Sequence, residues 1–132
     1  MRISTLIVVL ATLVGSNPAA IAEPLSTEES LFVTVTLVSL VVPIKCEGYE
    51  NIDGGLLRLG DAVGVDAGRL VRAVVASFSA ANGGEYDRDD LIPEVTRTLN
   101  QVAVQIPREG KSKPFCKKWG EMLVANHVAR RK

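Results

Sequence analysis

The chain contains two cysteines, Cys46 and Cys116, so only one intramolecular disulfide is possible. A disulfide that closes a loop of about 71 residues stabilises a fold by roughly 4.4 kcal/mol through chain entropy, comparable with the whole stability of a marginal domain. Neither cysteine lies in a C-x-x-C motif, whose close spacing lowers the pKa of a thiol. We therefore expect a structural disulfide rather than a redox-active pair.

Residues 1–22 have the three parts of a secretory signal peptide. A positive Met1-Arg2 precedes an apolar run over residues 3–14, and Ala20-Ile21-Ala22 forms an A-x-A cleavage site. The run is shorter than the roughly 20 apolar residues that span a bilayer. We predict cleavage after Ala22 and a periplasmic or secreted protein. In such an oxidising compartment the two cysteines should pair.

A second apolar stretch covers residues 31–44. It contains three hydroxyl-bearing residues, and its length suits a buried core element better than a transmembrane helix. Ser26 and Glu29 match a capping box just before it, which predicts a helix over residues 27–42 that ends at Pro43. The β-branched alternation inside the same stretch leaves a strand as the alternative.

Further helix signals follow along the chain. Asp66 is placed to cap one helix, Asn82-Gly83-Gly84 to end it, and Pro93 fits the first turn of the next. The expected helices cover residues 53–63, 67–81, 90–104 and 115–128. The sequence thus predicts an all-α protein, a small bundle of four or five helices cross-linked by one disulfide after a cleaved signal peptide. Its expected parts are a single helical domain over residues 23–129 and a frayed basic tail over residues 130–132.

Each cysteine begins a C-x-x-aromatic pattern, in Cys46-Glu47-Gly48-Tyr49 and in Cys116-Lys117-Lys118-Trp119. Positions i and i+3 share a helix face, so both aromatic rings could flank the disulfide. A small, exported, helical chain with one long-range disulfide is similar in outline to the periplasmic acid-stress chaperones of the HdeA/HdeB family. The first cysteine of that family commonly has the same context. This resemblance implies a helical stress chaperone.

Charge is distributed unevenly along the chain. Residues 108–132 contain eight lysines and arginines against two glutamates, whereas residues 23–107 contain six against 13 acids. A basic end of this kind can bind an anionic partner. It can equally pair with acids of the body, such as Asp87, Asp89 or Glu94, and both hypotheses stand. The residues that we assign to an anionic partner are Lys117, Lys118, Arg130, Arg131 and Lys132.

The chain offers few groups for catalysis or metal binding. Its single histidine, His127, has no second imidazole with which to build a His-based zinc site. An EF-hand loop counted from Asp87 would place Leu91 and Ile92 where an oxygen ligand and a glycine are needed. We expect no catalytic residue, no metal and no cofactor. We also expect no nucleic acid, because aromatic residues are not interleaved with the basic ones.

These observations predict an exported, non-enzymatic protein that binds other proteins, with a stress chaperone as one example. The alternative is a module that binds an anionic envelope surface, such as lipid headgroups, through its basic C-terminal end. Salt separates the two, because exposed charges are screened over about 8 Å at physiological ionic strength.

Overall fold

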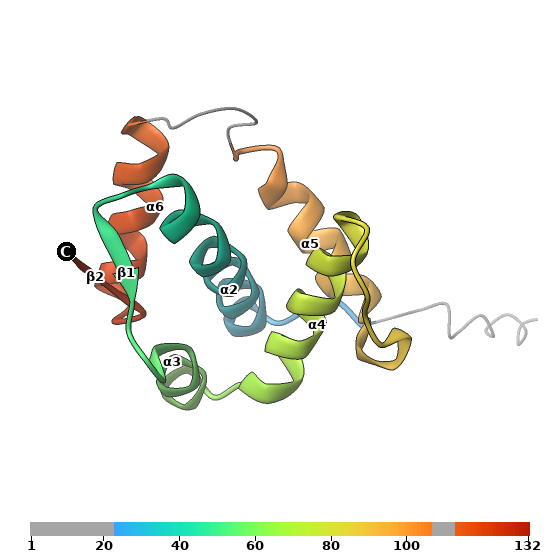
Figure 1. The fold of residues 1–132 in the computed structure, drawn as a ribbon. Helices are drawn as coiled ribbons and strands as arrows, with labels where there is room; N and C mark the ends of the chain where they lie inside the picture. The colour runs from blue at the N-terminus through green and yellow to red at the C-terminus, as the bar shows by residue number, and fades with distance from the viewer. Residues whose placement is uncertain (1–22, 107–112) are drawn as a thin grey trace, which may run out of the picture.

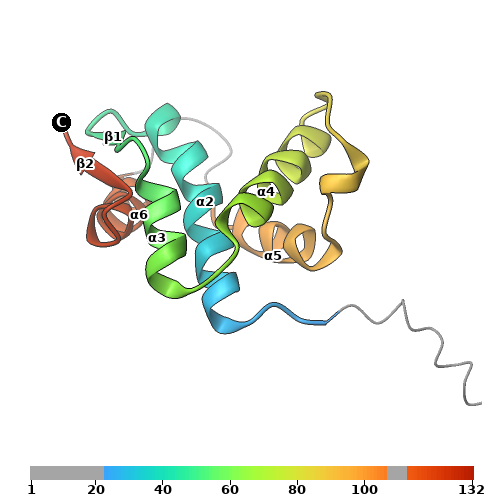
Figure 2. The same ribbon diagram turned by 90° about the horizontal axis from the view of Figure 1, so that it is seen from below.

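The structure, a computed structural model, describes residues 23–106 and 113–132. This part of the chain is mostly helical, with five α-helices, one 3₁₀ turn and a two-stranded ribbon. The elements are α2 (Thr27–Lys45), β1 (Tyr49–Asn51), α3 (Gly55–Val63), α4 (Ala67–Ala81), η1 (Arg88–Asp90), α5 (Pro93–Ala103), α6 (Lys113–Ala125) and β2 (Ala129–Arg131). Helix α2 lies in the middle, with α6 and the ribbon on one side and α4 and α5 on the other (Figures 1 and 2). The predicted helical bundle is confirmed in outline, whereas the predicted signal peptide lies outside the described residues.

Helix α2 forms the centre of the core. Its first turn is closed by the predicted capping box, in which Ser26 Oγ accepts from the Glu29 N–H at 3.0 Å and Glu29 accepts from the Ser26 N–H at 2.9 Å. Inside the helix, the Thr36 and Ser39 hydroxyls donate to carbonyls of the preceding turn, so neither is left unpaired among apolar neighbours. The stretch is therefore a helix, and the strand alternative is wrong. Its buried residues are Phe32, Val33, Val35, Thr36, Leu37, Val38, Ser39, Val41 and Val42.

Helix α2 does not end at Pro43, contrary to the prediction, but continues to Lys45. Proline lacks the N–H that would bond to the carbonyl four residues earlier, which here belongs to Ser39. That buried carbonyl instead accepts a hydrogen bond from Asn51 Nδ2 at 2.9 Å. A side chain of β1 thus replaces the missing donor, and this replacement lets the helix run through the proline.

By length and composition alone, α2 could cross a membrane, and it is the one helix in the described ranges for which this holds. However, 50% of its apolar stretch is buried within the fold. The core helix of a soluble protein has the same length and composition, so the burial agrees with the predicted core element.

On the side of α4 and α5, the first helix follows its capping signal and the second begins later than predicted. Asp66 accepts from the Arg69 N–H at 3.1 Å and caps α4, as predicted. Helix α5 begins at Pro93, later than the predicted residue 90, because the residue before a proline is driven out of the helical region and Ile92 is extended. Asp87 caps the short 3₁₀ turn η1 instead, accepting from the Asp89 N–H at 2.9 Å.

The C-terminal end of the chain differs most from the prediction. Helix α6 ends at Ala125 and not at residue 128, because His127 adopts a left-handed conformation (φ 60°) and reverses the chain. The Val128 N–H then bonds to the Leu123 carbonyl at 2.9 Å, which completes the helix terminus. The expected frayed tail is instead strand β2, which pairs antiparallel with β1 so that Arg130 faces Glu50.

Cys46 and Cys116 form the predicted disulfide, with 2.01 Å between the sulfur atoms and 5.7 Å between the Cα atoms. The bond joins the C-terminal end of α2 to the first turns of α6. A disulfide is compatible with an exported protein. The ring of Tyr49 packs against Gly120, one turn beyond Cys116, where a Cβ would fall less than 3.0 Å from three ring carbons.

Candidate functional site

An apolar groove of about 610 Å³ lies between α2, α4 and α5. Its floor consists of buried side chains of the core, and its rim includes Ile44, which is 79% exposed at the end of α2. We call this hollow the apolar groove. It is lined by Leu37, Val41, Ile44, Lys45, Ser77, Phe78, Ala80, Ala81, Asn82, Leu91, Thr96, Leu99, Asn100, Ala103 and Ile106.

The groove exists because small side chains face each other across it. The end of α4 contributes Ser77, Ala80 and Ala81, and α5 contributes Ala103, so the two helices leave space that larger residues would fill. The hydroxyl groups of Ser77 and Thr96 hydrogen-bond to each other at 2.8 Å. Their polar atoms are therefore satisfied, and the floor presents a mainly apolar surface.

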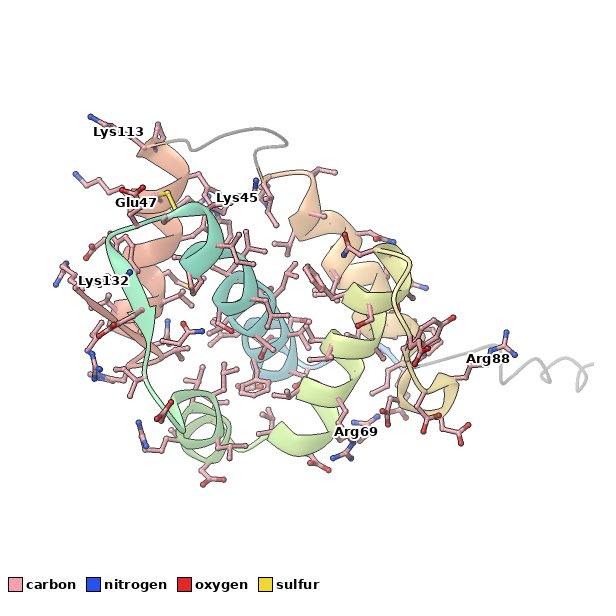
Figure 3. The ribbon with its side chains drawn as sticks, viewed as in Figure 1. Lys45, Glu47, Arg69, Arg88, Lys113 and Lys132 are labelled. Carbon is pink, nitrogen blue, oxygen red and sulfur yellow. A yellow bond between two sulfur atoms is a disulfide. The ribbon has the colours of Figure 1, made fainter. Side chains whose placement is uncertain are left out.

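Lys45 is the one charged side chain among the residues that line the groove. No acidic group lies within ion-pair distance of it in the described part of the chain. Lys45 ends α2, and Figure 3 shows it at the end of the helix that the disulfide ties to α6. The groove thus combines a long apolar surface with a single positive charge at one end.

The five residues assigned to an anionic partner lie at the other side of α2, on α6, on β2 and at the residue that follows β2. All five are exposed, and Figure 3 shows Lys132 on this side of the molecule. Two of them pair with acids: Arg130 Nε donates to Glu50 at 2.6 Å, and Arg131 pairs with Glu121. The five residues are Lys117, Lys118, Arg130, Arg131 and Lys132.

The predicted self-complementing acids are not the partners of the basic end. Glu94 pairs with Arg97 within α5, and Asp87 and Asp89 make no ion pair with another described residue. Glu50 and Glu121 take the role instead, because β2 returns beside β1 and α6. Two of the five basic residues thus pair with acids of the chain itself, and binding of an anionic partner by the basic end stays a prediction.

Hydrogen bonds at the ribbon shift the pKa values of its ionisable groups. The Arg130 guanidinium holds the pKa of Glu50 below its ordinary value of 4.5. Arg131, and then the Tyr49 hydroxyl, lower the pKa of Glu121 in the same way. Tyr49 donates to Glu121 at 2.7 Å, and that bond, with burial as a second cause, raises the pKa of Tyr49 above 10.0. The network fastens the C-terminal strand to the bundle.

Within residues 23–106 and 113–132, no three histidine, cysteine, aspartate or glutamate side chains are grouped so that they could hold a metal ion. Comparison of the chain with models of protein families, with curated proteins and with solved structures finds no match. The function must therefore be inferred from the groove and the basic end themselves.

Sequence reasoning missed the apolar groove. The one signal for it is the run of small residues at the end of α4, where Ser79, Ala80 and Ala81 follow Phe78. Such a run at the end of an amphipathic helix predicts either close helix packing or unfilled space. Only the placement of α5 relative to α2 decides between them.

Proposed function

We propose that the chain is an exported, non-enzymatic protein, periplasmic or secreted, that binds an apolar segment of another protein in the apolar groove. A stress chaperone is one protein of this kind. The observation that carries the proposal is the groove: its volume of about 610 Å³ falls within the roughly 300–1,000 Å³ typical of binding sites. The disulfide and the signal-peptide pattern of residues 1–22 support export.

The lining suits binding better than catalysis. Its polar groups are hydroxyls, amides and one ammonium group, and no carboxylate, thiol or imidazole of the described residues lines it. General acid–base chemistry requires groups that titrate near the working pH. The exposed side chain of Ile44 instead gains from being covered, because apolar area removed from water contributes about 25 cal/mol per Å².

The test is binding of an unfolded chain to the protein purified with its disulfide intact. Carbamidomethylated α-lactalbumin is a suitable probe, since its blocked cysteines keep it unfolded. The Ala103→Trp variant fills the groove and should weaken binding at least tenfold, while the matched Ala62→Trp variant on the exposed surface of α3 should bind like wild type. Equal melting temperatures would show that both variants fold. Binding that Ala103→Trp leaves unchanged would refute the proposal.

A second candidate function is attachment to an anionic envelope surface through the basic C-terminal end. The exposure of Lys117, Lys118 and Lys132, which make no ion pair within the described residues, supports it. The triple alanine variant at these positions spares the paired arginines of the ribbon. It should lose binding to phosphatidylglycerol vesicles at low salt, whereas phosphatidylcholine vesicles should bind neither protein. Full binding by the variant at low and high salt would exclude this function.

A further inference from the structure

We infer that the occupant of the apolar groove is an amphipathic α-helix of the partner, seated with an acidic first turn against Lys45. This inference rests on the proposed function and names the chemistry of the segment that would bind. It follows from three properties of the groove: the kind of backbone that walls it, its volume, and the position of its one charge.

The walls favour a helix over an extended segment. They are formed mainly by α2, α4 and α5, in which most backbone N–H and C=O groups are bonded within the helix, and neither strand of the ribbon contributes to the lining. An extended peptide pressed into this groove would bury its own backbone groups without partners. A helix satisfies those groups internally and presents only side chains to the groove.

The volume admits one face of such a helix. Two turns of α-helix with their side chains occupy roughly 1,000 Å³, being about 11 Å long and 10–12 Å wide. The groove holds about 610 Å³. Only side chains spaced at i, i+3 or i+4, and i+7 can therefore enter, while the opposite face stays in water. The segment must be amphipathic.

Charge sets the direction in which the helix lies. The groove is bordered by the last turns of α2, α4 and α5, through Lys45, Ala81 and Ala103, and these three helices all rise towards the top of Figure 1. Helix C-termini carry partial negative charge, which attracts the positive N-terminal end of another helix but opposes a carboxylate, so the acid must lie against the full positive charge of Lys45. Aspartate and glutamate stabilise a helix in its first turn. An acidic side chain there would meet the ammonium group of Lys45.

The experiment uses synthetic 16-residue amphipathic helical peptides with leucines on one face. One peptide has two glutamates in its first turn, a second has two lysines there, and a third has the two glutamates in its last turn. Binding to the disulfide-bonded protein is measured by fluorescence anisotropy, for wild type, for Lys45→Glu, and for Lys117→Glu as a control of equal charge outside the groove. Dodecanoate serves as a competitor that has an apolar chain and an anionic head without a backbone.

Wild type should prefer the first-turn glutamate peptide over the lysine peptide by about fivefold, the upper range for a solvent-accessible ion pair. Lys45→Glu should reverse this preference, and Lys117→Glu should keep it. The last-turn peptide should bind more weakly than the first-turn one. Equal binding of all three peptides that Ala103→Trp abolishes would overturn the inference and leave the proposed function standing. Binding of dodecanoate, measured directly by calorimetry, in a protein that binds neither the peptides nor unfolded α-lactalbumin would overturn both.

Discussion

The two sides of α2 differ in what holds the neighbouring elements against it. On the side of α6 and the ribbon, the chain is fixed by a disulfide, by strand pairing and by the contacts of Glu121 with Tyr49 and Arg131. On the side of α4 and α5, apolar contact dominates, and the Ser77–Thr96 hydrogen bond is the one inter-helix bond of side chains recorded between those two helices in the described residues. Smaller hollows of about 360 and 410 Å³ lie beside α6 and beside β1 and α3, whereas the side held by apolar contact keeps the groove of about 610 Å³.

Loss of the disulfide should produce the largest effect. The Cys46→Ser/Cys116→Ser double variant removes the restriction on a loop of about 71 residues, worth roughly 4 kcal/mol in unfolding free energy. The thermal midpoint should fall by more than about 10 °C. Hydrogen exchange should show the amides of α6 and the ribbon opening before those of α4. An unchanged midpoint would show that the disulfide does not stabilise the side of α6 and the ribbon.

Adding one methyl group on the fixed side should destabilise the protein. In Gly120→Ala, the new Cβ would collide with the Tyr49 ring, and overpacking typically costs about 1–3 kcal/mol. The higher helix propensity of alanine offsets up to about 1 kcal/mol of this. Gly68→Ala in α4 is the control, because its nearest neighbour is the flexible end of Arg72 at 3.5 Å. Chemical denaturation of both variants gives the comparison. A Gly120→Ala protein as stable as this control would contradict the tight packing described.

Removal of the Asn51 side chain tests the polar bond that supports α2. Asn51→Ala should cost about 1 kcal/mol, because the buried Ser39 carbonyl loses its donor. In a Pro43→Ala background the same substitution should cost much less, since residue 43 regains an N–H for that carbonyl. Unfolding free energies of the four proteins form a double-mutant cycle. Additive losses would mean that Asn51 does not replace the proline's missing donor.

Added apolar volume in the groove should stabilise the fold, whereas the preceding substitutions destabilise it. Ala80→Leu fills part of the groove and should stabilise the fold by about 0.5–1 kcal/mol, as cavity-filling substitutions commonly do. It should also weaken binding of the peptides. Ala62→Leu, on the exposed surface of α3, should change neither quantity. Destabilisation by Ala80→Leu would show that the groove is not free space.

The smallest effect should come from pH. The pKa values of Glu50 and Glu121 are lowered in the folded protein, so both carboxylates stabilise it above pH 4.5, the ordinary glutamate pKa. This contribution should disappear as the pH falls from 4.5 through the lowered values. The stability that wild type has in excess of the Glu50→Gln/Glu121→Gln variant should therefore decrease as the pH is lowered below 5. Urea midpoints that run parallel for the two proteins across this range would contradict it.

Local signals in the sequence predicted the parts of the fold that local chemistry decides. Ser26 with Glu29, and Asp66, each cap the helix they were expected to cap, because a cap involves residues within one turn. The disulfide was predictable because two cysteines allow only one intramolecular pairing.

The predictions that failed concern features that depend on contacts between distant parts of the chain. Pro43 ends a helix unless another part of the chain supplies a donor, and Asn51 does so after a reversal of the backbone. Arg130 and Arg131 would be a frayed tail without a strand to pair with. That strand is β1, in which Glu50 precedes Arg130 by 80 residues. The groove depends on the sizes of side chains on three separate helices. None of these relations has a local pattern.

The position of α2 has a consequence for how the chain reaches its fold during synthesis. The helix that lies at the centre is the first described element to be made, and the strand that closes the ribbon is the last. Until α4, α5 and α6 follow, the apolar surface of α2 has nothing to cover it, and a ribosome-bound fragment would expose a segment that resembles a membrane span. An incomplete chain should therefore be prone to aggregation until the covering helices have been made. Folding is expected to be post-translational, because the elements that cover α2 are all made after it.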